Sequence, residues 1–180
     1  GSVWSNYNVV WHMDGTSSNI LKESRISAHA TPYNFDELRV PGIIGTALSF
    51  DGVNDYVDLP LSVHPKSENR QLTISFWSYG GPNLSASKNT TLFESGSALG
   101  RSLNLHFPYN SKLHWEGGSD NSYDNINKDF SAYKGRWDYW VLQKDVDSGS
   151  MYVYRNGQLW NDGYERTRPF GEPHERVRRW

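Results

Sequence analysis

The sequence predicts an all-β protein built as a two-sheet antiparallel β-sandwich. Apolar residues alternate with polar ones at a period of two along the 180 residues, and helical spacing is almost absent. Gly, Asn, Asp and Ser bound the alternating runs, as expected for turns between short strands. The chain has no cysteine, but at this length folding buries roughly 70% of the unfolded surface. A core therefore forms without a disulfide or metal staple.

The first clear strands lie in the middle of the chain. Residues 72–79 place Leu, Ile and Phe on one face and Thr, Ser, Trp and Tyr on the other, which is typical of a central strand with both faces partly covered. Residues 103–107 and 113–116 alternate in the same way. The dipeptide Asn110–Ser111 between them predicts a hairpin tip.

Two more hairpins are predicted toward the C-terminus. Strands at 137–145 and 150–155 flank residues 146–149, whose glycine suits the positive φ of a bulged hairpin. Asn156–Gly157 is the strongest two-residue turn signal in the chain and leads into a strand at 158–160. About nine short strands result.

Two stretches, 14–45 and 117–136, lack this alternation and are expected to be long irregular loops. Elsewhere alternation defines the side chains expected to face the core between the sheets. The predicted core comprises Phe50, Val57, Ile74, Phe76, Leu105, Val141 and Val153.

Charge and hydropathy exclude several classes of function. A net charge of −2 gives no overall field for nucleic acid or an anionic membrane, and no apolar run approaches the roughly 18 residues of a spanning helix.

Residues 1–2 look like a purification-tag remnant, so we expect an excised module of a longer protein. One domain is expected over 3–165, followed by a basic tail at 166–180 with five arginines and two glutamates.

Five segments resemble, in order, the laminin-G-like, concanavalin A-like jelly-roll domains of bacterial secreted and surface proteins. These are residues 10–15, 45–59, 72–77, 137–141 and 151–157, and the resemblance covers roughly residues 8–163. It implies a carbohydrate-binding or adhesion module at the cell surface or in the secreted fraction, with a glycan or cell-surface polysaccharide, or a protein, as partner. The alternatives are a structural or protein-interaction domain without a sugar site, and a glycosidase-like enzyme.

No catalytic residues are predicted. The glycosidases of this fold carry a Glu-x-Asp-x-x-Glu strand motif, whose alternation places the carboxylates on one face. No such segment exists here, and motifs for serine or metal hydrolases are also absent. Of the nearest acidic pairs, Asp55 with Asp58 and Asp145 with Asp147 fall at turns, and two glycines separate Glu116 from Asp120. These carboxylates are interpreted as turn formers or metal ligands.

Calcium is the expected cofactor because it takes oxygen ligands from loops rich in Asp, Asn and Gly. One candidate cluster lies in the motif turns beside the first long loop, and a competing cluster lies in the second. The first comprises Asp14, Asp51 and Asp55, and the second comprises Asp120, Asp124 and Asp129.

A sugar site is predicted at and after the strand at 113–116. Sugar recognition needs an aromatic plate for the C–H face of a pyranose and planar carboxylates or amides for its hydroxyls. The alternative is that the tryptophan is core and the other residues hold the loop together. The candidates are Trp115, Glu116, Asp120, Asn121, Tyr123 and Asp124.

The tail shows no match to the closing strands of the resembled family. If residues 166–180 dock on the acidic body, Phe170 and Trp180 are the expected apolar anchors, because exposed arginine pairs contribute only about 0 to 1 kcal/mol each. Without a covering tail, one sheet would present an open edge that invites a partner strand.

Overall fold

The computed structural model describes residues 3–13, 20–80, 91–97, 100–119, 122–130 and 135–172, with the backbone alone at 91–97, 100 and 101. The chain divides into two compact units, one running to His64 and the other starting at Pro65. The sequence had indicated one domain over 3–165. In the described part of the chain, no helix has the length and apolar character needed to cross a membrane.

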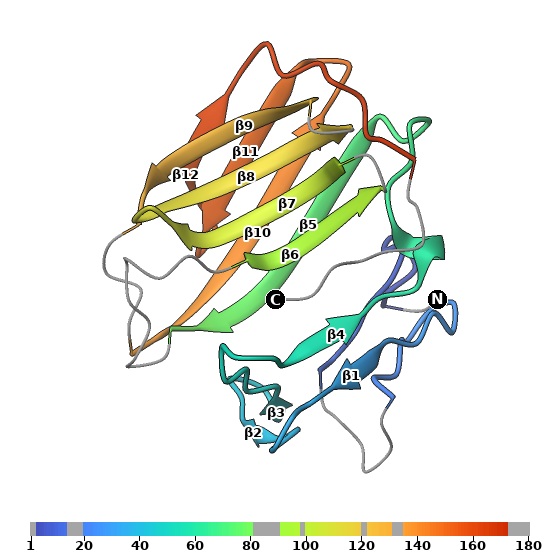
Figure 1. Cartoon of the computed structure of the whole chain (residues 1–180), viewed down its shortest axis with the longest axis vertical. Helices are drawn as coiled ribbons and strands as arrows, with labels where there is room; N and C mark the ends of the chain where they lie inside the picture. The colour runs from blue at the N-terminus through green and yellow to red at the C-terminus, as the bar shows by residue number, and fades with distance from the viewer. Residues whose placement is uncertain are drawn as a thin grey trace. The chain divides into compact units, whose positions relative to one another are not determined.

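The first unit contains short antiparallel strand pairs joined by irregular chain (Figure 1). Strand β1 (Thr31–Tyr33) pairs with β4 (Tyr56–Asp58), and β2 (Val40–Pro41) pairs with β3 (Thr46–Ala47). A 3-10 turn, η1, covers Leu61–Val63. Much of the stretch expected to be irregular, residues 14–45, therefore lacks strands apart from β1 and β2 in its described part.

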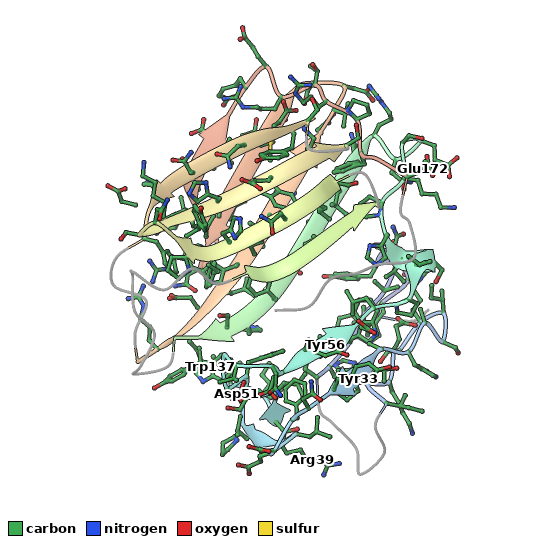
Figure 2. The ribbon with its side chains drawn as sticks, in the orientation of Figure 1. Tyr33, Arg39, Asp51, Tyr56, Trp137 and Glu172 are labelled. Atoms are coloured by element: carbon green, nitrogen blue, oxygen red, sulfur yellow. The ribbon has the colours of Figure 1, made fainter. Side chains whose placement is uncertain are left out.

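Aromatic contacts are prominent in this unit, but its core differs from the prediction. Tyr33 and Tyr56 stack at 4.8 Å between ring centroids, and Figure 2 labels both. Phe50, predicted as core, is 51% exposed and forms a T-shaped ring contact with Phe35. That prediction is wrong because Phe50 precedes a turn, where strand alternation no longer fixes which way a side chain faces.

The second unit is a sandwich of two four-stranded antiparallel sheets, which lie face to face in Figure 1. We call them the β6–β9 sheet and the β5–β12 sheet. The β6–β9 sheet contains, in spatial order, β6 (Thr91–Ser97), β7 (Gly100–Tyr109), β8 (Lys112–Ser119) and β9 (Ser122–Asp129). The β5–β12 sheet has the order β12 (Gln158–Gly163), β11 (Ser150–Arg155), β10 (Trp137–Asp145) and β5 (Gln71–Tyr79).

The hairpins predicted from turn chemistry are confirmed. Strands β10 and β11 have the predicted bounds, and Gly149 between them has φ of 65°. Asn110 and Ser111 join β7 to β8 with φ of 48° and 64°. Asn156 and Gly157, with φ of 52° and 79°, join β11 to β12. Positive φ at these turns is the conformation that Gly and Asn tolerate best.

The expected loop at 117–136 is largely strand, so that prediction is wrong. Strand β8 continues to Ser119 and β9 follows after two residues. The Gly-Gly pair is needed for close packing rather than for a turn. A Cβ on Gly117 would lie 2.8 Å from Cδ of Lys144, and one on Gly118 would lie 2.4 Å from Cα of Tyr123.

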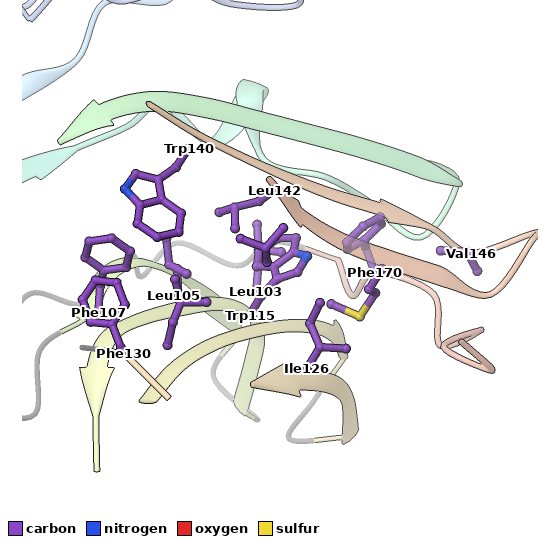
Figure 3. Close-up of a cluster of buried hydrophobic side chains, with 13 residues drawn as sticks. Leu103, Leu105, Phe107, Trp115, Ile126, Phe130, Trp140, Leu142, Val146 and Phe170 are labelled. Carbon is purple, nitrogen blue, oxygen red and sulfur yellow. The ribbon is translucent and has the colours of Figure 1, made fainter. Parts of the chain in front are cut away.

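The core between the two sheets is rich in large side chains (Figure 3). Leu105 and Val153 are buried as predicted, while Ile74 and Phe76 pack against the cluster partly buried. Val141 faces away from it, which corrects the prediction, because β10 turns its even positions inward. The buried cluster is Leu103, Leu105, Phe107, Leu113, Trp115, Ile126, Phe130, Trp140, Leu142, Val146, Met151, Val153 and Phe170.

The C-terminal segment closes this core. Phe170 is 1% exposed and belongs to the cluster, as the anchor prediction required, whereas Trp180 lies outside the described residues. The backbone N–H of Ser67 donates to Glu172, labelled in Figure 2, at 3.1 Å. The described part of the tail is therefore packed on the second unit.

Candidate functional site

Strands β8 and β9 divide the predicted sugar-binding residues between the two faces of their sheet. Side chains alternate along a strand, so Trp115 and Glu116 point to opposite sides, as do Tyr123 and Asp124. Trp115 and Asp124 face the sandwich interior, and Glu116 and Tyr123 line a cavity on the other face. Asp120 and Asn121 lie outside the described residues.

Trp115 does not offer an aromatic plate to a ligand. Its side chain is fully buried, and its indole Nε1 donates a hydrogen bond to the backbone oxygen of Gln143 at 3.1 Å. Gln143 belongs to β10, so the indole ties the two sheets together. The binding prediction for Trp115 is wrong, and its core alternative is confirmed.

Asp124 is also an interior residue. Its Oδ2 accepts hydrogen bonds from Nζ of Lys144 at 2.7 Å and from the backbone N–H of Arg168 at 2.9 Å. Nζ of Lys144 additionally donates to the backbone oxygen of Arg166 at 2.8 Å. Burial lowers the pKa of Lys144, while its hydrogen bond to Asp124 acts in the opposite direction. Asp124 thus holds the C-terminal segment and is not available to a sugar.

Glu116 is held in place by amides from both neighbouring strands. Antiparallel register puts Asn104 of β7 and Asn125 of β9 directly opposite Glu116. Nδ2 of Asn104 donates to its Oε2 at 3.0 Å, and Nδ2 of Asn125 donates to its Oε1 at 2.8 Å. The two amides orient the carboxylate, and Asn127 orients Asn125 in turn through a hydrogen bond of 2.8 Å.

Aromatic and imidazole rings surround this carboxylate in a cavity of about 150 Å³ lined by His106, Tyr109, His114, Glu116 and Tyr123. The ring of His106 lies 4.8 Å from Tyr109 and 6.1 Å from His114, measured between centroids. Burial lowers the pKa of His114, although the nearby Glu116 raises it. His114 is therefore neutral near pH 7.

Two buried polar atoms at this site have no hydrogen-bond partner among the described residues. They are Oδ1 of Asn104 and Nε2 of His114. An unsatisfied buried polar atom is costly and calls for an explanation, such as a water or a ligand group. The site therefore combines a fixed carboxylate, unfilled hydrogen-bonding atoms and ring surfaces.

Sequence analysis missed most residues of this site. Asn104, His106 and His114 were seen only as the polar half of the alternation that predicts strands, and Asn125 lay in the stretch expected to be a loop. The usable signal was that polar residues with hydrogen-bonding side chains repeat at every second position on consecutive strands. Register, which the sequence leaves open, is what aligns them.

The structure describes two of the three residues in the first predicted calcium cluster, Asp51 and Asp55. Oδ1 of Asp51, labelled in Figure 2, accepts hydrogen bonds from the backbone N–H groups of Val53 at 2.7 Å and Asn54 at 3.3 Å. Oδ2 of Asp55 accepts from the backbone N–H of Asp51 at 2.8 Å. Burial, opposed by that hydrogen bond, raises the pKa of Asp55, and the charge of Asp51 raises it further. Asp14 lies outside the described residues.

The competing calcium cluster does not assemble in the described part of the chain. Asp124 is paired with Lys144, Asp129 is exposed, and Asp120 is not described. Across the described residues, no three His, Asp or Glu side chains gather closely enough to hold a metal ion. Asp145 is a turn former, since its Oδ1 accepts hydrogen bonds from the backbone of Asp147 and Ser148 at 2.9 and 3.0 Å.

Comparison with known proteins shows which protein family the chain belongs to. Residues 51–173 match the laminin G family described as the concanavalin A-like lectin/glucanases superfamily, and the chain belongs to that family. The match extends past residue 165 into the basic tail, which sequence analysis had not matched to the closing strands of the family. No curated protein sequence matches the chain.

Two solved structures share the fold. One is the HCR/D protein carrying a tryptophan-to-alanine substitution, with a TM-score of 0.61 and 19% identity over 85% of this chain and 39% of that one. The other is an S-layer domain-containing protein from Clostridium thermocellum, with a TM-score of 0.55 and 21% identity over 86% of this chain and 71% of that one. This chain thus spans well under half of the HCR/D protein.

Proposed function

We propose that this protein is a non-catalytic carbohydrate-binding or adhesion module of a larger secreted or surface protein, and that its glycan binds over Glu116. The carboxylate fixed by Asn104 and Asn125 in a ring-lined cavity is the observation that carries this proposal. The superfamily of lectins and glucanases to which the chain belongs supports it. Fold alone would not suffice, because folds host many functions.

The chemistry of the site suits a sugar. A carboxylate held by neighbouring amides accepts hydrogen bonds from sugar hydroxyl groups without first having to be ordered. His114 lines the cavity, and its Nε2 accepts or donates a hydrogen bond according to its tautomer. The exposed rings of Tyr109 and Tyr123 provide surfaces for pyranose C–H groups.

A binding role is favoured over glycoside hydrolysis by the carboxylates at the site. Hydrolysis ordinarily uses two carboxyl groups, roughly 5 to 9.5 Å apart, on either side of the scissile bond. The described residues lining the cavity include one, Glu116. A protein-interaction domain without a sugar site remains the competing function, and a glycan array separates the two.

The test is a glycan array with the wild-type chain, Glu116→Gln and Tyr123→Ala. Glu116→Gln replaces a charged acceptor by an amide, and we expect binding of the best glycan to fall at least tenfold. Glu68→Gln, at an exposed position of the same unit, is the matched control and should bind normally. An array with no glycan above background would favour the protein-interaction function, and release of reducing sugar would favour the enzyme.

We also propose that calcium binds the first unit through Asp51 and Asp55, with Asp14 as the third predicted ligand. Oδ1 of Asp55 is buried and has no hydrogen-bond partner in the described part of the chain, which supports an ion there. Calcium should raise the melting temperature, because a ligand of the folded state stabilises it by mass action. Asp51→Ala should abolish that increment, and identical melting curves in calcium and in excess chelator would contradict the proposal.

A further inference from the structure

On strands β5 and β10, the face that points away from the core is aromatic, and from Thr73 to Tyr79 and from Trp137 to Gln143 it carries no charged side chain. Along β5 and β10, alternation directs every second side chain away from the core, and these positions are the more exposed ones. We use the name aromatic face for the outward-facing aromatic rings of β5, β10 and β11. It consists of Trp77, Tyr79, Trp137, Tyr139, Tyr152 and Tyr154.

The rings of β5 and β10 are aligned by strand register. Tyr139 lies opposite Trp77, and Trp137, labelled in Figure 2 at the start of β10, lies opposite Tyr79. Their centroids are 5.2 Å apart in the first pair and 5.5 Å in the second. The two pairs follow one another along the strands at about 7 Å, the spacing of alternate residues. Neighbouring rings hold each other, so their orientation is set before any ligand arrives.

These rings are not needed to build the core. Trp77 is 44% exposed and Tyr79 is 47% exposed, although each is among the largest side chains of the chain. Contiguous apolar surface of this kind usually marks an interaction site.

The side chains between and beside the rings define the ligand. On β5 and β10, the remaining outward positions from Thr73 to Tyr79 and from Trp137 to Gln143 are Thr73, Ser75, Val141 and Gln143, none of them charged. Nε2 of Gln143 donates to Oγ1 of Thr73 at 3.5 Å, a long hydrogen bond that a ligand hydroxyl can replace. Flat rings next to neutral hydroxyls and amides match a ligand that presents C–H faces and hydroxyls without charge.

From this combination we infer that the aromatic face is a second binding surface, specific for an extended neutral polysaccharide that stacks on Trp77, Tyr79, Trp137 and Tyr139. It lies on the opposite sheet from Glu116, so the module engages glycan on two separate faces. Two faces engaged by one polymer raise the overall avidity without any new contact at either site. The inference does not depend on the Glu116 site.

Affinity gel electrophoresis of the full chain in hydroxyethylcellulose, mixed-linkage β-glucan or arabinoxylan tests this inference, with polygalacturonate as the charged comparison. We expect at least one neutral polymer to retard the wild type, and Trp77→Ala and Trp137→Ala to weaken that retardation at least tenfold. Quenching of tryptophan fluorescence by the same polymer should decrease in both variants. Glu68→Gln and the exposed Tyr7→Ala are the controls and should retain the retardation.

Three results would overturn the inference. The first is a wild type that none of the neutral polymers retards, and the second is retardation unaffected by Trp77→Ala and Trp137→Ala. The third is a wild-type dimer in sedimentation that Trp77→Ala dissociates, since the face would then bind a second copy. The glycan array tests the Glu116 site separately. If Glu116→Gln loses glycan binding on the array while no neutral polymer retards the wild type, the Glu116 site is upheld and the aromatic face is not a binding surface.

Discussion

The two sheets of the second unit share one core but carry opposite chemistry on their outward faces. The outward face of β7, β8 and β9 is built around a single carboxylate held by amides, with imidazole and phenol rings beside it. The outward face of β5 and β10 is a row of indole and phenol rings with no charge between them. A sandwich needs only its inward positions for stability, so its two outward faces are free to differ.

Within single strands of the β6–β9 sheet, neighbouring residues are likewise divided between the core and the candidate site. On β8, Trp115 supports the core while its neighbour Glu116 belongs to the site. On β9, Asp124 anchors the C-terminal segment through Lys144 while Tyr123 lines the cavity. Substitutions at adjacent positions should therefore affect stability and binding separately, and the following experiments measure how complete that separation is.

The largest effect is expected from Trp115→Ala. Removing a fully buried indole leaves a cavity between the sheets and loses the hydrogen bond to Gln143, so unfolding free energy should fall by about 3 to 5 kcal/mol. Urea unfolding measures this loss. Tyr123→Ala on the next strand, which faces the cavity, is the comparison and should cost less than about 1 kcal/mol. Equal costs would contradict the assignment of faces.

The next largest effect is expected from Asp124→Asn. It leaves the buried ammonium of Lys144 without a charged partner, and unfolding free energy should fall by about 3 kcal/mol. The double variant Asp124→Leu with Lys144→Met removes both charges and should recover much of that loss. A loss below about 1 kcal/mol in the single variant, measured by urea unfolding, would show that the pair does not hold the C-terminal segment.

A smaller, pH-dependent effect is expected from His114. Burial lowers its pKa in the folded state, so the unfolded chain takes up a proton first as the pH falls. Its contribution is fully present above about pH 6.5, the unfolded pKa, and is lost as the pH falls below that value. Urea unfolding at pH 7.5 and 5.5 should show a smaller pH-dependent loss in His114→Gln than in the wild type.

Some pH dependence should remain in that variant, because burial also lowers the pKa of His64 in the first unit. The informative quantity is thus the difference between the two proteins over the same pH interval. An identical loss in the wild type and in His114→Gln would show that the cavity imidazole titrates normally.

The smallest effect on stability is expected from Trp77→Ala. Its ring is 44% exposed and packs on Tyr139 rather than in the core, so unfolding free energy should change by no more than about 0.5 kcal/mol. Together with the polysaccharide measurement, this result sharpens the contrast between the two sheets. A loss approaching that of Trp115→Ala would mean that the aromatic face is structural.

Features that depend on a few neighbouring residues could be predicted from the sequence, and features that depend on distant residues could not. The tip at Asn156–Gly157 was predictable because positive φ at a two-residue turn is a property of those two residues. Strand β9 was missed because Gly117 and Gly118, at the end of β8, indicated a loop, whereas Gly117 makes room there for Lys144 of β10. Close approach from a distant part of the chain leaves no local trace in the sequence.

Alternation, turn residues and family motifs in the sequence by themselves determined the two-sheet sandwich and its hairpins, because these depend on neighbours a few residues apart. Only the tertiary structure decided which half of each alternation faces the core, placing Trp115 and Asp124 inside and Glu116 and Tyr123 outside. The physical reason is strand register. A shift by one residue exchanges the two faces, and the pairing across strands that fixes it also brings Asn104, Glu116 and Asn125 together.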